Sequence, residues 1–271
     1  MNQAGPGVHY PIDSATQSEL DRLRRQHDAW HPAAEWLVAE VGVSSGWHCL
    51  DLGCGPEGLT TLLAERVGRS GRVVGLDANA DFIDLAHARA QANVEYVLGD
   101  AYDTGLPPES FDLVHFRFLA STAGEAERLL AEASRLLRPG GFLLAQEADA
   151  RSLNVHPPHR AWSRLRGILE VQFPACFDPY PVAHQLFGML KRARFEGVRL
   201  RPCIVGTDAA NPWWDYLPAT LEALRPRLIR QGDWDDSELS ELIDACRAHL
   251  ADESTTVNSV SLIQVFGQRA C

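Results

Sequence analysis

The residues best suited to chemistry in this chain are acids and glycines at the ends of short apolar segments. Residues 49–60 read Cys-Leu-Asp-Leu-Gly-Cys-Gly-Pro-Glu-Gly-Leu-Thr, so Asp51 precedes a turn that contains Gly53 and Gly55. Because both glycines lack a Cβ, the chain can turn sharply and a ligand can approach the backbone closely. Apolar residues at helical spacing follow, and the free N–H groups of a helix N-terminus suit an anionic group. The segment therefore predicts a strand, a glycine turn and a helix that bind the polar part of a cofactor.

A second acid follows at the distance expected of a nucleotide site. Asp77 ends the short apolar segment 72–77, about 20 residues after the glycines, where an acid can bind ribose hydroxyls. The spacing Gly53-x-Gly55-x-x-Gly58 also fits the dinucleotide fingerprint, so a nicotinamide-dependent dehydrogenase is an alternative. The acid before the glycines, the proline after Gly55 and a long helical segment before the first strand argue against that alternative.

Five segments in order resemble the motifs of class I S-adenosylmethionine-dependent methyltransferases. They cover residues 47–147 and read Asp51-Leu-Gly-Cys-Gly-Pro56, Val74-Gly-Leu-Asp77-Ala78, Val97-Leu-Gly-Asp100-Ala101, Phe111-Asp-Leu-Val-His-Phe-Arg117 and Leu137-Arg-Pro-Gly-Gly-Phe-Leu-Leu144. Tyr10 and the segment 19–26 also resemble a bacterial subgroup that acts on small molecules, the UbiE-like methyltransferases. The fourth segment lacks the Asn/Asp-Pro-Pro-Tyr/Phe signature of enzymes that methylate amino groups of DNA and polypeptides, which favours a small-molecule acceptor.

The resemblance implies S-adenosyl-L-methionine as cofactor, S-adenosyl-L-homocysteine as product, and a role for each matching residue. Gly53 and Gly55 would pass close to the methionine part, and Asp51 would lie near its ammonium group. The remaining expected cofactor residues are Asp77 at the ribose hydroxyls, Asp100 and Ala101 at the adenine, the backbone of Phe116 and Arg117 beside the sulfonium, and also Tyr10 and Ala78. Each acid also has a structural alternative, since Asp51 or Asp100 could cap a turn and Asp77 could belong to a helix N-cap.

One departure concerns Glu57, which stands where the family often has a third glycine. A glutamate in the first turn of a helix is favourable to the helix dipole. If its side chain turned inward it would repel the methionine carboxylate, so we expect it to face solvent.

The order of apolar segments predicts an α/β fold. Strands and helices alternate up to about residue 148, which indicates a parallel sheet covered by helices on both faces. Thr16-Gln-Ser-Glu19 has the form of a capping box and opens a first helix, and a second helix is expected from about 32 to 41. With the resemblance, the prediction is a Rossmann-like, doubly wound, mostly parallel seven-stranded sheet with an antiparallel last strand and helical lid inserts.

We expect one domain over residues 1–271. Residues 1–45 form an N-terminal helical cap and 46–150 the cofactor-binding core. Residues 151–181 and 208–256 form the lid inserts, and 182–207 and 257–271 complete the sheet. In the family, such inserts cover the substrate pocket.

Methyl transfer from a sulfonium depends mainly on positioning, which can supply ~7–11 kcal/mol of the barrier. A general base adds ~10²–10⁴-fold when the acceptor carries a proton. Glu147, at the end of the fifth strand and facing the lid, is the first candidate, with His115 and His184 next. His115 could equally be a hydrogen-bonded core histidine. Trp213, Trp214 and Tyr216 could stack on an acceptor or could pack the lid onto the core.

Composition excludes several classes. A formal net charge of −11 argues against a phosphate-binding surface, so no nucleic-acid partner is expected. The six cysteines form no C-x-x-C pair and the histidines lack partner ligands, so no metal site is expected. No apolar run approaches membrane-spanning length and no signal peptide is evident, which indicates a cytoplasmic protein without a membrane partner. The sequence leaves a homodimer open.

The sequence thus predicts a methyltransferase that acts on a small, apolar or aromatic metabolite. The alternative is a methyltransferase-like scaffold that binds the cofactor without methyl transfer, either as a cyclase-type biosynthetic enzyme or as a binding protein. The nicotinamide-dependent dehydrogenase ranks below both.

Overall fold

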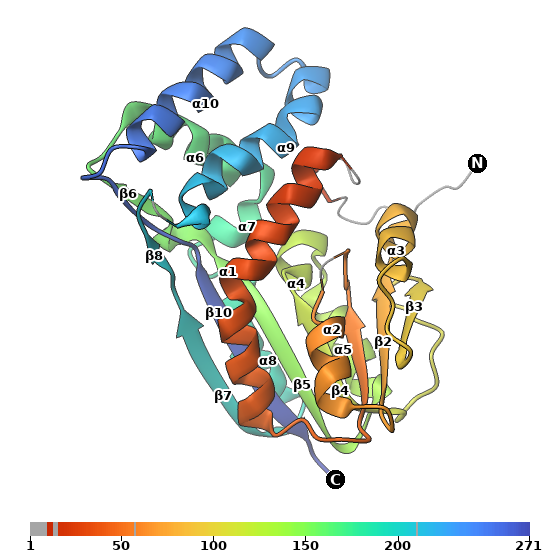
Figure 1. The fold of residues 1–271 in the computed structure, drawn as a ribbon. Coiled ribbons are helices and arrows are strands. Elements are labelled where there is room, and N and C mark those ends of the chain that lie inside the picture. The colour runs from red at the N-terminus through yellow and green to blue at the C-terminus, as the bar shows by residue number, and fades with distance from the viewer. Residues whose placement is uncertain (1–9, 13–15, 57, 210) are drawn as a thin grey trace.

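The computed structural model describes residues 10–12, 16–56, 58–209 and 211–271, so Glu57 lies outside the described residues. Its centre is a seven-stranded sheet in the order β3-β2-β1-β4-β5-β10-β7 (Figure 1). The strands are β1 (His48–Leu52), β2 (Arg72–Asp77), β3 (Val94–Leu98), β4 (Phe111–Arg117), β5 (Leu137–Asp149), β7 (Phe195–Cys203) and β10 (Ser261–Arg269). Strands β1 to β5 pair in parallel, whereas β10 runs antiparallel to both β5 and β7. The predicted mostly parallel sheet with an antiparallel last strand is confirmed.

Helices cover both faces of the sheet. They are α1 (Gln17–Val41), α2 (Thr60–Val67), α3 (Ala80–His87), α4 (Leu119–Ala123), α5 (Ala126–Leu136) and α8 (Val182–Arg192). Neighbouring residues on a strand point to opposite faces, and β1 accordingly sends Cys49 into a core with α1 and α2 and Leu50 into a core with α5 and α8. Both faces of the strands are therefore apolar, as expected of a parallel sheet between two helical layers.

The N-terminal helix differs from the prediction of two helices. α1 is continuous over 25 residues and contains Pro32. Its buried stripe, which includes Trp30, Ala34 and Leu37, runs past the proline without interruption. Burial of this stripe outweighs the single backbone hydrogen bond that a proline removes. The predicted boundaries hold, since the Thr16 side chain accepts from the Glu19 backbone N–H and Gly42 ends the helix at φ 77°.

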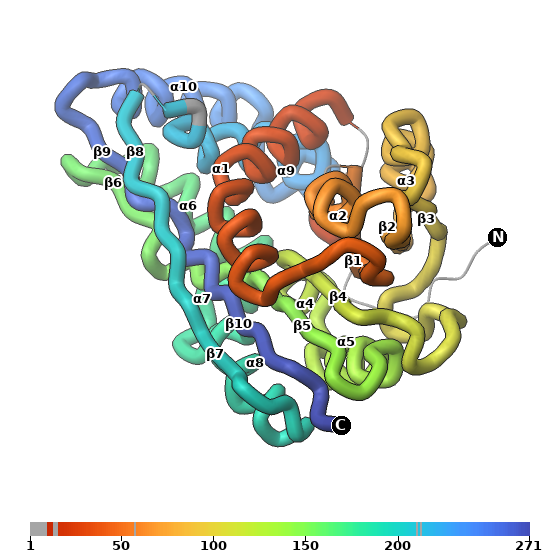
Figure 2. Tube along the Cα trace, turned by 60° about the horizontal axis from the view of Figure 1, so that its bottom comes forward, coloured from red at the N-terminus to blue at the C-terminus, as the bar shows by residue number. Residues whose placement is uncertain are grey.

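The two inserts form a third apolar core at the end of the sheet where β5 ends (Figure 1). They contribute α6 (Arg160–Gln172), α7 (Pro174–Phe177), α9 (Tyr216–Gln231), α10 (Asp236–Leu250) and two short 3₁₀ turns, Ala150–Ser152 and Pro212–Asp215. The prediction of purely helical inserts is incomplete. β6 (Asn154–His156), β9 (Thr256–Asn258) and β8 (Gly206–Thr207) form a small antiparallel sheet beside the lid (Figure 2). Within the described ranges, no helix has the length and apolar character needed to cross a membrane.

Candidate active site

A cavity of about 620 Å³ opens at the carboxyl ends of β1, β2 and β4, within the ~300–1,000 Å³ usual for small-molecule sites. Ligands of open α/β sheets bind at this edge. The glycine turn and the residues that follow β2 and β3 line one half of the cavity, which we call the cofactor half. Side chains of α1, α4, α6, α7 and α9 line the other half, which we call the acceptor half.

The glycine turn has the conformation that its sequence predicts. Gly53 and Gly55 lie at φ 66° and 55°, in the left-handed region that favours glycine. The Gly53 and Cys54 N–H groups donate to the Leu76 carbonyl at 2.7 and 3.0 Å. A Cβ on Gly58 would lie 2.3 Å from the Cys54 carbonyl oxygen. Gly58 is therefore required by the close approach of the two ends of the turn.

Asp77 connects the two predicted motifs. Its Oδ2 accepts from the Gly55 N–H at 2.8 Å and its Oδ1 from the Asn79 N–H at 2.9 Å. The N-cap of α3 is Asn79, whose side chain accepts from two backbone N–H groups, so Asp77 does not serve as that cap. Burial raises the pKa of Asp77, against the effect of these backbone hydrogen bonds. Ala78 lines the cavity beside it.

The far end of the cofactor half is formed after β3. Asp100 and Ala101 both line the cavity, and Asp100 is exposed while Ala101 is buried. One Asp100 oxygen accepts from the Tyr102 backbone N–H at 2.9 Å. No donor among the described residues contacts its second oxygen, which can therefore accept from a ligand.

Asp51 and His115 form a buried polar pair at the floor of the cavity. Asp51 Oδ2 accepts from the Leu59 N–H at 2.7 Å, which ties the end of β1 to the start of α2. Its Oδ1 lies 2.6 Å from His115 Nδ1. Gln146 Nε2 lies 2.9 Å from His115 Nε2, while its Oε1 accepts from Gln264 Nε2 at 3.1 Å. The Gln146 amide therefore donates to His115, whose proton lies on Nδ1 and points at Asp51.

Both ring nitrogens of His115 are thus used inside the protein. His115 lines the cavity floor, but in this state its ring has no free nitrogen with which to take a proton from an acceptor. The geometry favours the alternative of a hydrogen-bonded core histidine over the prediction that His115 is catalytic.

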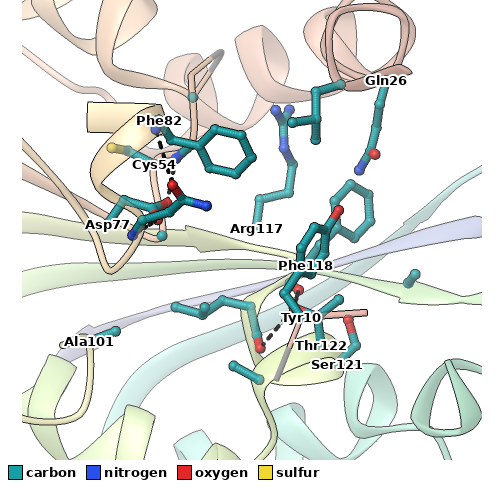
Figure 3. A pocket seen from close by; sticks show the side chains of 18 of the residues that line it. Tyr10, Gln26, Cys54, Asp77, Phe82, Ala101, Arg117, Phe118, Ser121 and Thr122 are labelled. Carbon is teal, nitrogen blue, oxygen red and sulfur yellow. Dashed lines mark hydrogen bonds between the residues drawn. The ribbon is translucent and has the colours of Figure 1, made fainter. Parts of the chain in front are cut away.

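At the end of β4, the Phe116 side chain is fully buried in the core between β4 and α5 and does not line the cavity, whereas Arg117 and Phe118 do. The prediction for Phe116 concerned its backbone and stays a prediction. Since successive strand residues alternate between faces, Phe116 and Arg117 cannot both face the same space. Figure 3 shows the Arg117 side chain extending into the cavity, with Phe82 to one side and Phe118 to the other.

The N-terminal segment contributes a closed polar cluster to the acceptor half. The Tyr10 hydroxyl donates to Glu19 Oε1 at 2.8 Å and accepts from Arg22 Nη2 at 2.8 Å. Arg22 also donates to both Glu19 oxygens, at 2.7 and 2.8 Å, and to Gln26 Oε1 at 2.6 Å. Tyr10, Arg22 and Gln26 all line the cavity. Tyr10, predicted as a cofactor residue, thus lies at the cavity but beside the acceptor half, and Arg22 and Gln26 of the same cluster were not predicted as site residues.

Two of the three predicted general-base residues do not face the cavity. Glu147 is fully buried behind α4, where its carboxylate accepts from the Ala120 and Ser121 N–H groups and from the Ser121 hydroxyl, at 2.9, 3.0 and 2.6 Å. Burial raises the pKa of Glu147 to about 7 despite these bonds. His184 lies on α8, half exposed, and its Nε2 is 3.0 Å from Asp149 Oδ2. Neither Glu147 nor His184 lines the cavity, so the structure places neither of these predicted bases beside an acceptor.

Of the three aromatic lid residues predicted to contact the acceptor, one lines the cavity and two do not. Tyr216 lines the cavity, but Trp213 and Trp214 do not. Trp213 is 2% exposed because its ring is stacked on Tyr216, with centroids 4.0 Å apart, and meets the edge of Trp30 at 5.7 Å. Trp213 thus packs the lid onto α1, while Trp214 packs against the same core. The acceptor half is instead lined by Leu169, Phe173, Phe177 and Thr220, which the sequence analysis missed.

Comparisons with known proteins agree with this geometry. Residues 50–145 match the family model described as a methyltransferase domain. A 2-phytyl-1,4-naphtoquinone methyltransferase of Thermosynechococcus vestitus is 37% identical over 208 residues, which cover 70% of this chain and 91% of that protein. A demethylmenaquinone methyltransferase of Lactococcus lactis is 29% identical over 154 residues, covering 54% of this chain and 60% of that protein. The chain spans 43% to 66% of the length of several other curated relatives.

Among solved structures, phosphoethanolamine N-methyltransferase 2 of Haemonchus contortus, in complex with S-adenosylhomocysteine, shares the fold. The TM-score is 0.57 at 17% identity, over 89% of this chain and 53% of that one. Neither the scaffold without methyl transfer nor the dehydrogenase finds support in these comparisons. With the sheet order, the glycine turn and the Thermosynechococcus relative, they show that the chain belongs to the class I S-adenosylmethionine-dependent methyltransferases.

Proposed function

We propose that this protein transfers a methyl group from S-adenosylmethionine to a small aromatic acceptor by in-line displacement. The observation that carries the proposal is one continuous cavity whose two halves differ in character. Glycines and acids line the cofactor half, and mainly apolar and aromatic side chains line the acceptor half. Such a cavity can align a nucleophile with the methyl carbon and exclude water, which are the main requirements of this reaction.

The cofactor half supports an extended binding mode. We propose that Asp77 accepts from the ribose hydroxyls, since each of its oxygens has one backbone partner and can accept a second bond. Asp100 and Ala101, one strand further along the same edge, would hold the adenine. Gly53 and Gly55 would border the methionine part, with Asp51 beneath its ammonium group.

The acceptor half supports a flat apolar acceptor. Phe118, Phe173, Phe177 and Tyr216 line it, and aromatic side chains of this kind stack on aromatic ligands. The relatives named above methylate quinones according to their names, and we infer a bicyclic quinol or a similar phenol as the acceptor class. The net charge of −11 supports a small molecule over a nucleic acid. A cytoplasmic location and a homodimer stay predictions.

Two measurements test the function in sequence. The melting temperature is followed with S-adenosylmethionine, S-adenosylhomocysteine and NAD, since a ligand at ~100 times its Kd stabilises the fold by ~2.7 kcal/mol. A response to NAD alone would overturn the proposal. Methyl-labelled S-adenosylmethionine is then incubated with 1,4-naphthoquinol, with phosphoethanolamine as the non-aromatic control. We expect label and S-adenosylhomocysteine only with the naphthoquinol. Cofactor binding without transfer to the naphthoquinol or a panel of phenols would favour a non-catalytic scaffold.

A further inference from the structure

Two arginines line the cavity, and the protein treats them differently. Arg22 is held by Glu19, Gln26 and Tyr10 at 2.6–2.8 Å. Arg117 has no hydrogen-bonding or ionic partner among the described residues, and its Nη1 is closed off from solvent. Its guanidinium carbon lies 5.9 Å from the centroid of the Phe118 ring.

An unpaired guanidinium that is largely closed off from water, as that of Arg117 is, lowers the stability of the folded protein. Burial lowers the pKa of Arg117, against the attraction of Asp51. Both Asp51 oxygens are already engaged, by the Leu59 N–H and by His115. A buried charge without a partner destabilises a fold, so the position is suited to an anion that a ligand brings.

The acceptor half offers further donors but no free base. Gln26 gives its Oε1 to Arg22, which leaves its amide N–H groups directed toward the cavity (Figure 3). The hydroxyl protons of Ser121, Thr122 and Thr220 are used on Glu147 and on backbone carbonyls. Among the described residues, the acids that line the cavity are Asp51, Asp77 and Asp100, all on the cofactor half.

We propose that Arg117 and the Gln26 amide form an anion subsite that binds the acceptor as its phenolate or enolate. This inference rests on the proposed function and states that its acceptor reacts in the deprotonated form.

The oxyanion, or a ring carbon conjugated to it, supplies the electron pair for the new bond to the methyl carbon. The bond from sulfur to that carbon breaks, and its electron pair stays on sulfur as a neutral thioether. The acceptor enters already deprotonated, so O-methylation needs no base, and after C-methylation the ring proton leaves to solvent.

The test compares two probes of almost equal shape on the complex with S-adenosylhomocysteine. 2-Hydroxy-1,4-naphthoquinone is an anion at neutral pH, whereas 2-methoxy-1,4-naphthoquinone has no acidic hydroxyl. By calorimetry we expect the wild-type protein to bind the hydroxy probe about 10–100-fold more tightly, the scale of a hydrogen bond to a charged group. R117M should abolish this preference, R117K should keep part of it, and both should bind S-adenosylhomocysteine within about threefold of wild type. R164M, at an exposed lid arginine paired with Glu238, is the control.

The fold of the variant is checked without ligand. Because R117M removes an unpaired and partly buried charge, its melting temperature should equal or exceed that of the wild type. A clearly lower value would mean that Arg117 has a partner in the free protein and would count against the proposal.

Other outcomes would overturn the anion subsite, and they differ from the outcome that would overturn the proposed function. Equal affinity for the two probes, or no binding of the hydroxy probe, would exclude the anion subsite although S-adenosylhomocysteine still binds. If R117M weakened S-adenosylhomocysteine as much as the hydroxy probe, Arg117 would serve the cofactor carboxylate instead. Failure of the wild-type protein to bind S-adenosylhomocysteine at all would refute the proposed function itself.

Discussion

The two halves of the cavity are built in different ways. In the cofactor half, acids accept from backbone N–H groups near them in the chain, as Asp51 does from Leu59 and Asp77 from Gly55 and Asn79. In the acceptor half, side chains from α1, α4, α7 and α9 meet across more than a hundred residues of sequence. A short motif therefore fixes the cofactor half, whereas packing of the lid fixes the acceptor half.

This difference implies that substitutions in the two halves have different consequences. On the proposed function, removing an acid of the cofactor half removes both a turn contact and a ligand contact. Removing a large side chain near the acceptor half loosens the lid core that Trp30, Trp213 and Tyr216 share. The predictions below test this division.

The largest effect is expected for D77A. If Asp77 binds the ribose hydroxyls, its loss removes charged hydrogen bonds worth about 1.5–3 kcal/mol each, so the Kd of S-adenosylhomocysteine should rise at least ~100-fold. D149A is the matched control, because Asp149 is bound by Arg151 and His184 and does not line the cavity. Calorimetry measures the Kd of S-adenosylhomocysteine for both variants. Equal losses of affinity would contradict the assignment of Asp77 to the cofactor half.

W213A should destabilise the fold without affecting cofactor affinity. A buried tryptophan truncated to alanine costs about 3–5 kcal/mol, and Trp213 lies in the lid core and not in the cavity wall. Urea denaturation measures the loss, with V171A at an exposed lid position as control. The Kd of S-adenosylhomocysteine for the folded variant should stay within about threefold. A stable W213A with impaired acceptor binding would instead mean that Trp213 contacts the acceptor.

The same division explains which residues the sequence could predict. Gly53, Gly55 and Asp77 follow from spacing along the chain, because the turn after β1 holds the glycines and the end of the next strand, β2, holds the acid. The acceptor half depends on which side of a strand or helix faces the cavity. Gln146 and Glu147 are adjacent on β5, and alternation turns the amide toward His115 and the acid toward α4. An acid beside an amide in the sequence does not reveal this orientation.

Two cavity residues that were not predicted, Arg22 and Gln26, could have been found from the sequence. Arg22 and Gln26 stand four residues apart, which places both on one face of a helix. Two polar side chains on a face that also carries the buried Trp30 indicate a cavity rather than solvent. What the sequence lacks is the partner of that face, since Tyr216 and Thr220 lie almost two hundred residues away.

E147Q should change how stability depends on pH. The folded protein raises the pKa of Glu147 to about 7, from 4.5, so between these values the folded state holds a proton that the unfolded chain releases. The free energy of unfolding of the wild type therefore falls as pH rises through this window, by up to roughly 3 kcal/mol from this group. E147Q should lack this fall in denaturation series from pH 4.5 to 8.

E132Q is the control, because the folded protein lowers the pKa of Glu132 whereas it raises that of Glu147. Hydrogen bonds from Arg135 first, and from Thr104, lower the pKa of Glu132 to about 2 against the effect of burial. Its stabilisation is present above the unfolded pKa and is lost as pH falls toward 2, so E132Q should be less stable than wild type throughout the range from pH 4.5 to 8. If E147Q and wild type had parallel profiles, the folded protein would not raise the pKa of Glu147, and burial of this carboxyl would not govern the pH dependence of stability.

H184A is expected to have the smallest effect. The His184 side chain is 42% exposed and its contact with Asp149 resembles a surface ion pair, worth about 0–1 kcal/mol. Asp149 keeps Arg151, which donates to both of its oxygens at 2.7 and 2.9 Å, so the end of β5 should keep its shape. We therefore expect kcat/KM within about twofold of wild type. A tenfold loss at unchanged stability would mean that the acceptor half extends to α8, and the boundary between the halves would then lie beyond β5.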